Sequence, residues 1–91
     1  MKIIEPAPIQ VELTDLDGKK HTLTARPMTR DRFKGLAVVA SDVAKMPVED
    51  QVAATVSYIY GGKKEDYFNF DIRSLKAAME YFNKELANPT A

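Results

Sequence analysis

The segment LTARPMTRDRFKGLA, residues 23–37, joins two kinds of secondary structure and decides how the chain folds. Its first residues continue an alternation of apolar and polar side chains, which is typical of a β-strand. Proline cannot donate a hydrogen bond to a strand partner, so the strand should end at Arg26-Pro27. Thr29 is suited to cap a helix, and the apolar residues after it recur at helical spacing. We therefore expect a strand that ends before Pro27 and a helix over residues 30–45.

The preceding residues, IQVELTDLDGKKHTLTA (9–25), predict a β-hairpin whose register follows from its apolar side chains. A two-residue turn on Asp17-Gly18 would mix polar and apolar side chains on both faces. A three-residue loop over residues 16–18, with Gly18 in the left-handed conformation, places the apolar side chains on one face. This register pairs Asp15 with Lys19, Leu13 with His21, Val11 with Leu23 and Ile9 with Ala25.

Three amphipathic segments predict helices over residues 30–45, 48–60 and 72–86. Pro47 should end the first helix, Gly61-Gly62 the second, and Asp71 should cap the third. The segment 63–70 is expected to be a loop whose aromatic side chains fold back on the core. The side chains expected to face inward are Phe33, Leu36, Ala37, Ala40, Val43 and Ala44 in the first helix, Val48, Val52, Val56 and Ile59 in the second, and Ile72, Leu75, Met79, Phe82 and Leu86 in the third.

These elements predict the fold class α+β, with an N-terminal antiparallel β-hairpin packed on a cluster of three α-helices. A chain of 91 residues leaves room for one core. We expect a flexible arm at residues 1–8, a single domain at 9–86 and a frayed tail at 87–91. A core of this size is thin, which favours association with a partner or with a second copy, so we also expect a homo-oligomer.

Composition argues against several classes of protein. The chain has 13 basic and 13 acidic residues, whereas nucleic-acid binders usually carry a basic excess. It has no cysteine, which excludes disulfides and thiolate metal sites. It shows neither a secretory leader nor an apolar run long enough to span a bilayer. We therefore expect a soluble cytoplasmic protein that binds neither nucleic acid nor a membrane.

No group of residues matches a catalytic or cofactor site. The only histidine, His21, falls near the hairpin tip, and the serines fall on predicted helices with no base beside them. The segment GGKKED (61–66) lacks the first glycine and the hydroxyl residue of a phosphate-binding loop. In DLDG (15–18) the glycine stands at the wrong position for an EF-hand. We expect no catalytic residue, no cofactor and no metal.

Two sets of residues are candidates for binding a partner. Positive charge gathers where the first helix begins, where it opposes the helix dipole; the residues are Arg26, Arg30, Arg32 and Lys34. This cluster either meets an anionic partner or is neutralised by solvent and by acidic residues at 49, 50, 65 and 66. Val38, Tyr58 and Tyr81 fall outside the expected inward faces. They either form a second contact surface or are buried because each helix packs on more than one neighbour.

The order of these segments resembles the tail assembly chaperones of long-tailed bacteriophages. The likeness covers roughly residues 9–86 and rests on a hairpin ending in LTARPMT, a helix opening with RDRFKGLA, and the segments VEDQVAATVSYIYGG and DIRSLKAAMEYFNKEL. In that family a strand leads into Arg-Pro, then Leu or Met, then Thr. A helix with an early aromatic residue follows.

The resemblance implies a non-enzymatic chaperone that binds and solubilises the tape measure protein during tail assembly in the infected bacterial host. It also implies that the protein is absent from the mature virion. This chain would be the short form, and a frameshift-extended form would recruit the tail tube protein. The family supplies no residue roles to carry over, so the candidates Val38, Tyr58, Tyr81, Arg30, Arg32 and Lys34 rest on helix geometry and charge. Two alternatives stay open, namely a structural tail or head–tail connector protein and a small nucleic-acid-binding regulator.

Overall fold

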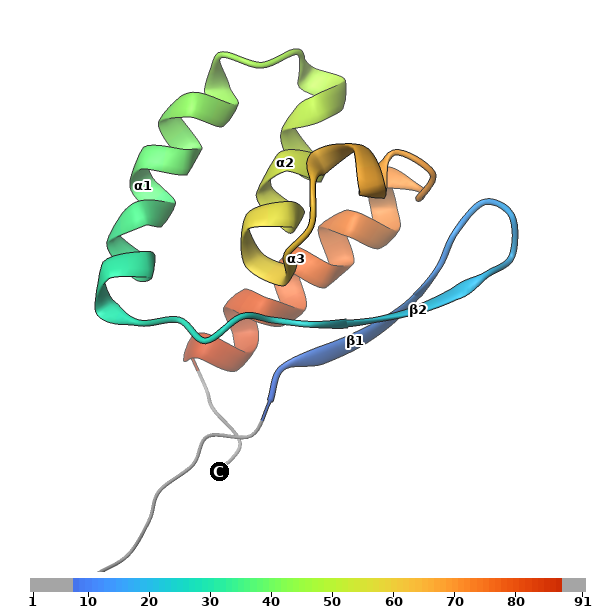
Figure 1. The fold of residues 1–91 in the computed structure, drawn as a ribbon, viewed down its shortest axis with the longest axis horizontal. Coiled ribbons are helices and arrows are strands. Elements are labelled where there is room, and N and C mark those ends of the chain that lie inside the picture. Colours follow the sequence, from blue (N-terminus) through green and yellow to red (C-terminus); the bar gives the residue numbers. More distant parts are fainter. Residues whose placement is uncertain (1–7, 88–91) are drawn as a thin grey trace, which may run out of the picture.

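A computed structural model describes residues 8–87 and shows a β-hairpin followed by three α-helices (Figure 1). Strands β1 (Gln10–Thr14) and β2 (Lys20–Thr24) pair antiparallel. They lead into α1 (Arg30–Ala44), α2 (Val48–Tyr60), a short 3-10 helix η1 (Lys64–Tyr67) and α3 (Ile72–Ala87). The predicted α+β class is confirmed. The predictions for the arm at 1–8 and the tail at 87–91 fall outside the described residues, except for Pro8 and Ala87.

The hairpin has the predicted register. Leu13 lies opposite His21, Val11 lies opposite Leu23, and Gly18 has a φ of 87°. The amide of Asp15 donates a hydrogen bond of 2.9 Å to Lys19 O, which closes the three-residue loop. Side chains along both strands alternate between exposed and half-buried, so one face of the ribbon covers the helices.

The carboxylate of Asp15 holds the hairpin tip together. Its Oδ1 accepts hydrogen bonds of 2.9 Å from the amides of Asp17 and Lys19, and its Oδ2 lies 2.8 Å from His21 Nε2. The hydrogen bond from His21 lowers the pKa of Asp15, with the two amides adding to the effect. The tip is tied to the helical part because the amide of Leu16 donates to Asn69 O at 2.9 Å. His21 is therefore part of a structural contact.

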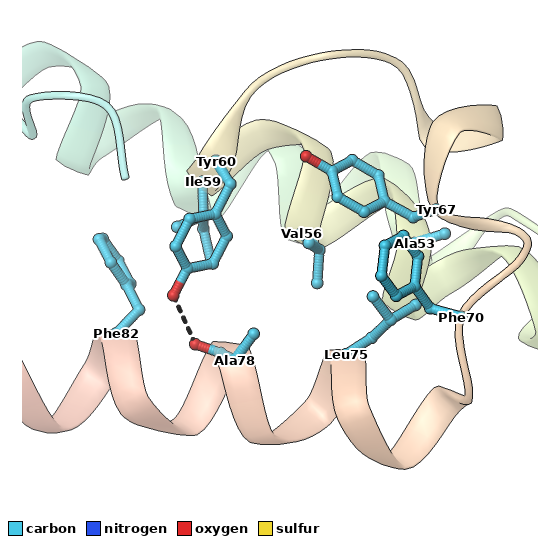
Figure 2. Packing of buried hydrophobic residues seen from close by; sticks show 9 residues of the cluster. All are labelled: Ala53, Val56, Ile59, Tyr60, Tyr67, Phe70, Leu75, Ala78 and Phe82. Carbon is cyan, nitrogen blue, oxygen red and sulfur yellow. Dashed lines mark hydrogen bonds between the residues drawn. The ribbon is translucent and has the colours of Figure 1, made fainter. Parts of the chain in front are cut away.

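The core lies between α2, α3 and the segment that connects them (Figure 2). Val56, Leu75 and Phe82 are at most 2% exposed. Tyr67 and Phe70 from the connecting segment fold back onto them, as predicted, although part of this segment forms η1 and Phe68 points outward with 52% exposure. The nine core residues are Ala53, Val56, Ile59, Tyr60, Tyr67, Phe70, Leu75, Ala78 and Phe82.

Helix α1 lies outside this core and packs on α2 (Figure 1). The predicted inward face of α1 was largely wrong. Phe33 is 58% exposed, and the alanines at 37, 40 and 44 are exposed as well. The side that faces α2 carries Arg32, Gly35, Leu36, Val39 and Val43. This spacing is also helical, but a search for apolar residues passes over it because it includes an arginine and a glycine.

The inward faces of the other two helices were predicted better, except near the helix ends. Val48, Ile72 and Leu86 were expected to be buried, but they are 77%, 46% and 36% exposed. Val48 and Ile72 are the first residues of their helices, and Leu86 is the next to last residue of α3. A facing helix covers the ends of its neighbour least, so periodicity alone overestimates burial there.

Tyr60 provides a test of the core at alkaline pH. Its hydroxyl donates a 2.7 Å hydrogen bond to Ala78 O, and burial raises its pKa to about 12 (Figure 2). Because the folded state keeps the proton that the unfolded chain loses near pH 10, stability should fall as the pH rises from about 10 to about 12. In the Tyr60→Phe variant, the free energy of unfolding should fall less steeply over this pH range. Urea unfolding followed by circular dichroism at several pH values measures this slope. An unchanged slope in the folded variant would contradict the burial of this hydroxyl.

Candidate partner-binding surface

Two of the six candidate residues, Arg32 and Tyr58, contact each other between α1 and α2. The guanidinium of Arg32 donates hydrogen bonds to Pro27 O at 3.1 Å and to Tyr58 O at 2.6 Å. The hydroxyl of Tyr58 donates to Arg32 O at 2.9 Å, and the guanidinium carbon lies 4.9 Å from the centre of the Tyr58 ring. These contacts give both side chains a structural role in joining the two helices.

Gly35 makes this contact possible, and the sequence analysis overlooked it. A Cβ atom at position 35 would lie 2.5 Å from the hydroxyl oxygen of Tyr58, which is closer than such atoms can approach. A glycine inside a helix is unfavourable by itself, since it is about 1 kcal/mol less stable there than alanine. That local penalty is the one feature of the sequence that could have indicated a close approach at this position.

Three other candidates, Arg30, Lys34 and Val38, form one exposed strip along α1. They are spaced by four residues, so each lies about one helical turn from the next. Val38 is 64% exposed, and both basic side chains are exposed as well. Among residues 8–87, the ion pairs closer than 4.0 Å do not include Arg30 or Lys34. The strip therefore combines positive charge with an apolar side chain.

The basic cluster is smaller than its four residues suggest. Arg32 is committed to the contact with Tyr58, and the guanidinium of Arg26 lies over Gly61, with its Nε 3.1 Å from where a Cβ would be. Two of the four acidic residues named as possible partners have other contacts: Asp50 pairs with Lys64 at 3.4 Å, and Asp66 accepts a hydrogen bond from the amide of Lys63. Only Arg30 and Lys34 of the four basic side chains belong to the exposed strip.

Tyr81, the sixth candidate, lies apart from the α1 strip. It is 40% exposed on α3 and borders a shallow cavity of about 360 Å³ between α3 and β1. Residues Gln10 to Leu13 line the opposite side of this cavity. The exposed candidates thus fall in two regions, one on α1 and one where α3 meets the hairpin.

An apolar pocket at the beginning of α2 and α3 was missed in the sequence analysis. It has a volume of about 360 Å³, and its walls include the core residues Tyr67, Phe70 and Leu75. Phe68 and Ile72 form part of its edge and are 52% and 46% exposed. Glu49 and Asp50 complete the edge. The sequence predicted Ile72 to be buried and treated the two acidic residues only as favourable to the helix dipole.

The described residues contain no group of three or more histidine, aspartate or glutamate side chains that could hold a metal ion. None of their helices has the length and apolar character needed to cross a membrane. The chain matches no family model, no curated protein and no solved structure.

Proposed function

We propose that this protein is a tail assembly chaperone that binds the phage tape measure protein and keeps it soluble while the tail is built. The partner class comes from the resemblance described above. The observation that carries the binding role is the number of large apolar side chains left exposed among residues 8–87. Seven of them lie beyond the hairpin and belong to the proposed surface: Phe33, Val38, Val48, Phe68, Ile72, Tyr81 and Leu86, each at least 36% exposed. Leu16, at the hairpin tip, is exposed as well but is not part of this surface.

Such a surface suits a partner that is a long amphipathic helix. A helix of this kind presents apolar side chains every three or four residues, and it is bound through apolar contacts along its length. Val38 and Tyr81 would meet the apolar side of the partner, and Arg30 and Lys34 would lie beside acidic residues next to it. Covering the apolar stripe would prevent the partner from aggregating with other copies.

Release of the partner follows from the same features. The exposed apolar residues are spread over several elements and do not form one deep groove, so each contact contributes little. Weak individual contacts allow tail tube subunits to displace the chaperone as they polymerise. We further propose that the protein acts in the cytoplasm of the infected host and is absent from the virion. A frameshift-extended form would recruit the tail tube protein.

The test is co-expression with the tape measure protein of the same genome, followed by size-exclusion chromatography. We expect the tape measure protein to become soluble and to elute together with the chaperone. The double variant Val38→Glu/Tyr81→Glu should lose at least tenfold in affinity and keep its circular dichroism spectrum, because both side chains are exposed. Leu16→Glu is the matched control, since Leu16 is 69% exposed at the hairpin tip and lies outside both regions.

Two results would contradict the proposal. A tape measure protein that stays insoluble with both the short and the extended forms would exclude the chaperone role. Detection of this protein in purified virions would favour a structural tail or connector protein instead. A nucleic-acid-binding role would require a mobility shift that weakens with salt, and the commitment of Arg32 to Tyr58 removes one of the four cations on which such a role would depend.

A further inference from the structure

Phe33 on α1 is an aromatic side chain that the packing of α1 on α2 leaves exposed. It is 58% exposed in the first turns of α1, at the flank of the side that carries Val39 and Val43. Arg30 precedes it by one turn and Lys34 follows it directly, and both are exposed. Phe33 is therefore an apolar projection flanked by positive charge.

The pocket at the beginning of α2 and α3 has the complementary character. Its volume of about 360 Å³ is sufficient for an aromatic ring, and its walls offer the rings of Tyr67, Phe68 and Phe70 for offset or edge-on contacts. Glu49 and Asp50 stand at its edge. Glu49 is exposed and, among residues 8–87, belongs to none of the ion pairs, whereas Asp50 pairs with Lys64 at 3.4 Å. The pocket is therefore apolar inside and bears unpaired negative charge at its edge.

The two features lie on different sides of the molecule. The first turns of α1 are separated by α2 from η1 and from the beginning of α3 (Figure 1). Phe33 consequently cannot fill the pocket of its own chain. A second copy, however, presents the same side chain and the same flanking charges.

We propose that Phe33 of one copy inserts into this pocket of a second copy, with Arg30 and Lys34 facing Glu49. The contact joins two different surfaces, so it is heterologous: in a pair, one copy keeps a free pocket and the other keeps a free Phe33. Such a contact produces head-to-tail chains or a closed ring. The contact uses Arg30 and Lys34, which also belong to the proposed partner surface, but its test needs only the purified protein and therefore does not depend on the proposed function.

The test is sedimentation velocity of the purified full chain over a range of concentrations at low and high salt. We expect the average mass to rise with concentration and to fall with salt, because opposite charges flank the contact. Phe33→Glu and Ile72→Glu should each reduce self-association at least tenfold. Both positions lie in the first turns of helices and are exposed, where a carboxylate is compatible with folding. Circular dichroism checks that each variant is folded, and Leu16→Glu should associate like the original chain.

A mixture of the two variants distinguishes this contact from any symmetric one. The Phe33→Glu chain retains an intact pocket and the Ile72→Glu chain retains an intact Phe33, so together they can form one complete contact. We expect heterodimers and no larger species. A chain that remains monomeric at all concentrations would overturn the proposal. So would variants that still associate alone, or a mixture that stays monomeric.

Discussion

Replacing Phe82 with alanine is expected to remove a large part of the stability of this domain. The side chain is 1% exposed and meets Tyr60 edge-on, with the ring centres 6.3 Å apart (Figure 2). Removing a buried phenylalanine ring costs about 3–5 kcal/mol, because the apolar transfer energy is lost and a cavity remains. A domain of this size has a total stability of about 5–14 kcal/mol. Urea unfolding followed by circular dichroism should show a midpoint shifted strongly downward, or no folded baseline.

The control for this experiment is the exposed phenylalanine on α1. Phe33→Ala removes the same ring from a position that is 58% exposed, so its effect on the stability of the monomer should stay within about 0.5 kcal/mol. Measuring both variants at low protein concentration separates stability from self-association. Equal losses for the two variants would mean that α3 does not form the centre of the core.

The strands and helix limits could be predicted because each depends on local chemistry. A slip of one residue in the hairpin would have moved every apolar side chain to the other face, so the pattern from Val11 to Leu23 allowed one register. Thr29 caps α1 as expected, with its hydroxyl oxygen accepting a hydrogen bond from the amide of Arg32 at 3.3 Å. Asp71 likewise accepts one from the amide of Arg73 at 2.8 Å, at the beginning of α3.

The orientation of α1 could not be predicted in the same way. It depends on hydrogen bonds from Arg32 to two backbone carbonyls, and one of these belongs to Tyr58, which is 26 residues away. A count of apolar positions assigns Arg32 to the solvent and Phe33 to the core, whereas the structure shows the reverse arrangement. The exposure of Val38 and Tyr81 could be predicted from helical spacing, because both residues lie off the main apolar faces of their helices.

Replacing Arg32 with alanine is expected to release α1 from α2 while leaving the core folded. Val43 is the one buried side chain of α1, at 8% exposed, so the attachment depends heavily on the contact between Arg32 and Tyr58. A hydrogen bond to a charged group contributes about 1.5–3 kcal/mol. Since α2, α3 and the segment that connects them form the core without α1, the loss should appear as local opening. Hydrogen exchange should become at least tenfold faster in α1 and change little in α2 and α3.

Arg30→Ala is the matched control, because Arg30 is exposed and its positive charge opposes the dipole of the same helix. It should leave exchange in α1 unchanged or slightly slower. Equal acceleration across all three helices of the Arg32→Ala variant would show that α1 belongs to the cooperative core.

If α1 opens alone, Arg32→Ala should also weaken both proposed contacts. The reason is that α1 holds in place both the strip of Arg30, Lys34 and Val38 and the projecting Phe33. Arg32 would then affect binding without touching the partner. Hydrogen exchange distinguishes this indirect effect from the loss of a direct contact, because exchange in α1 should stay normal in the Val38→Glu/Tyr81→Glu variant.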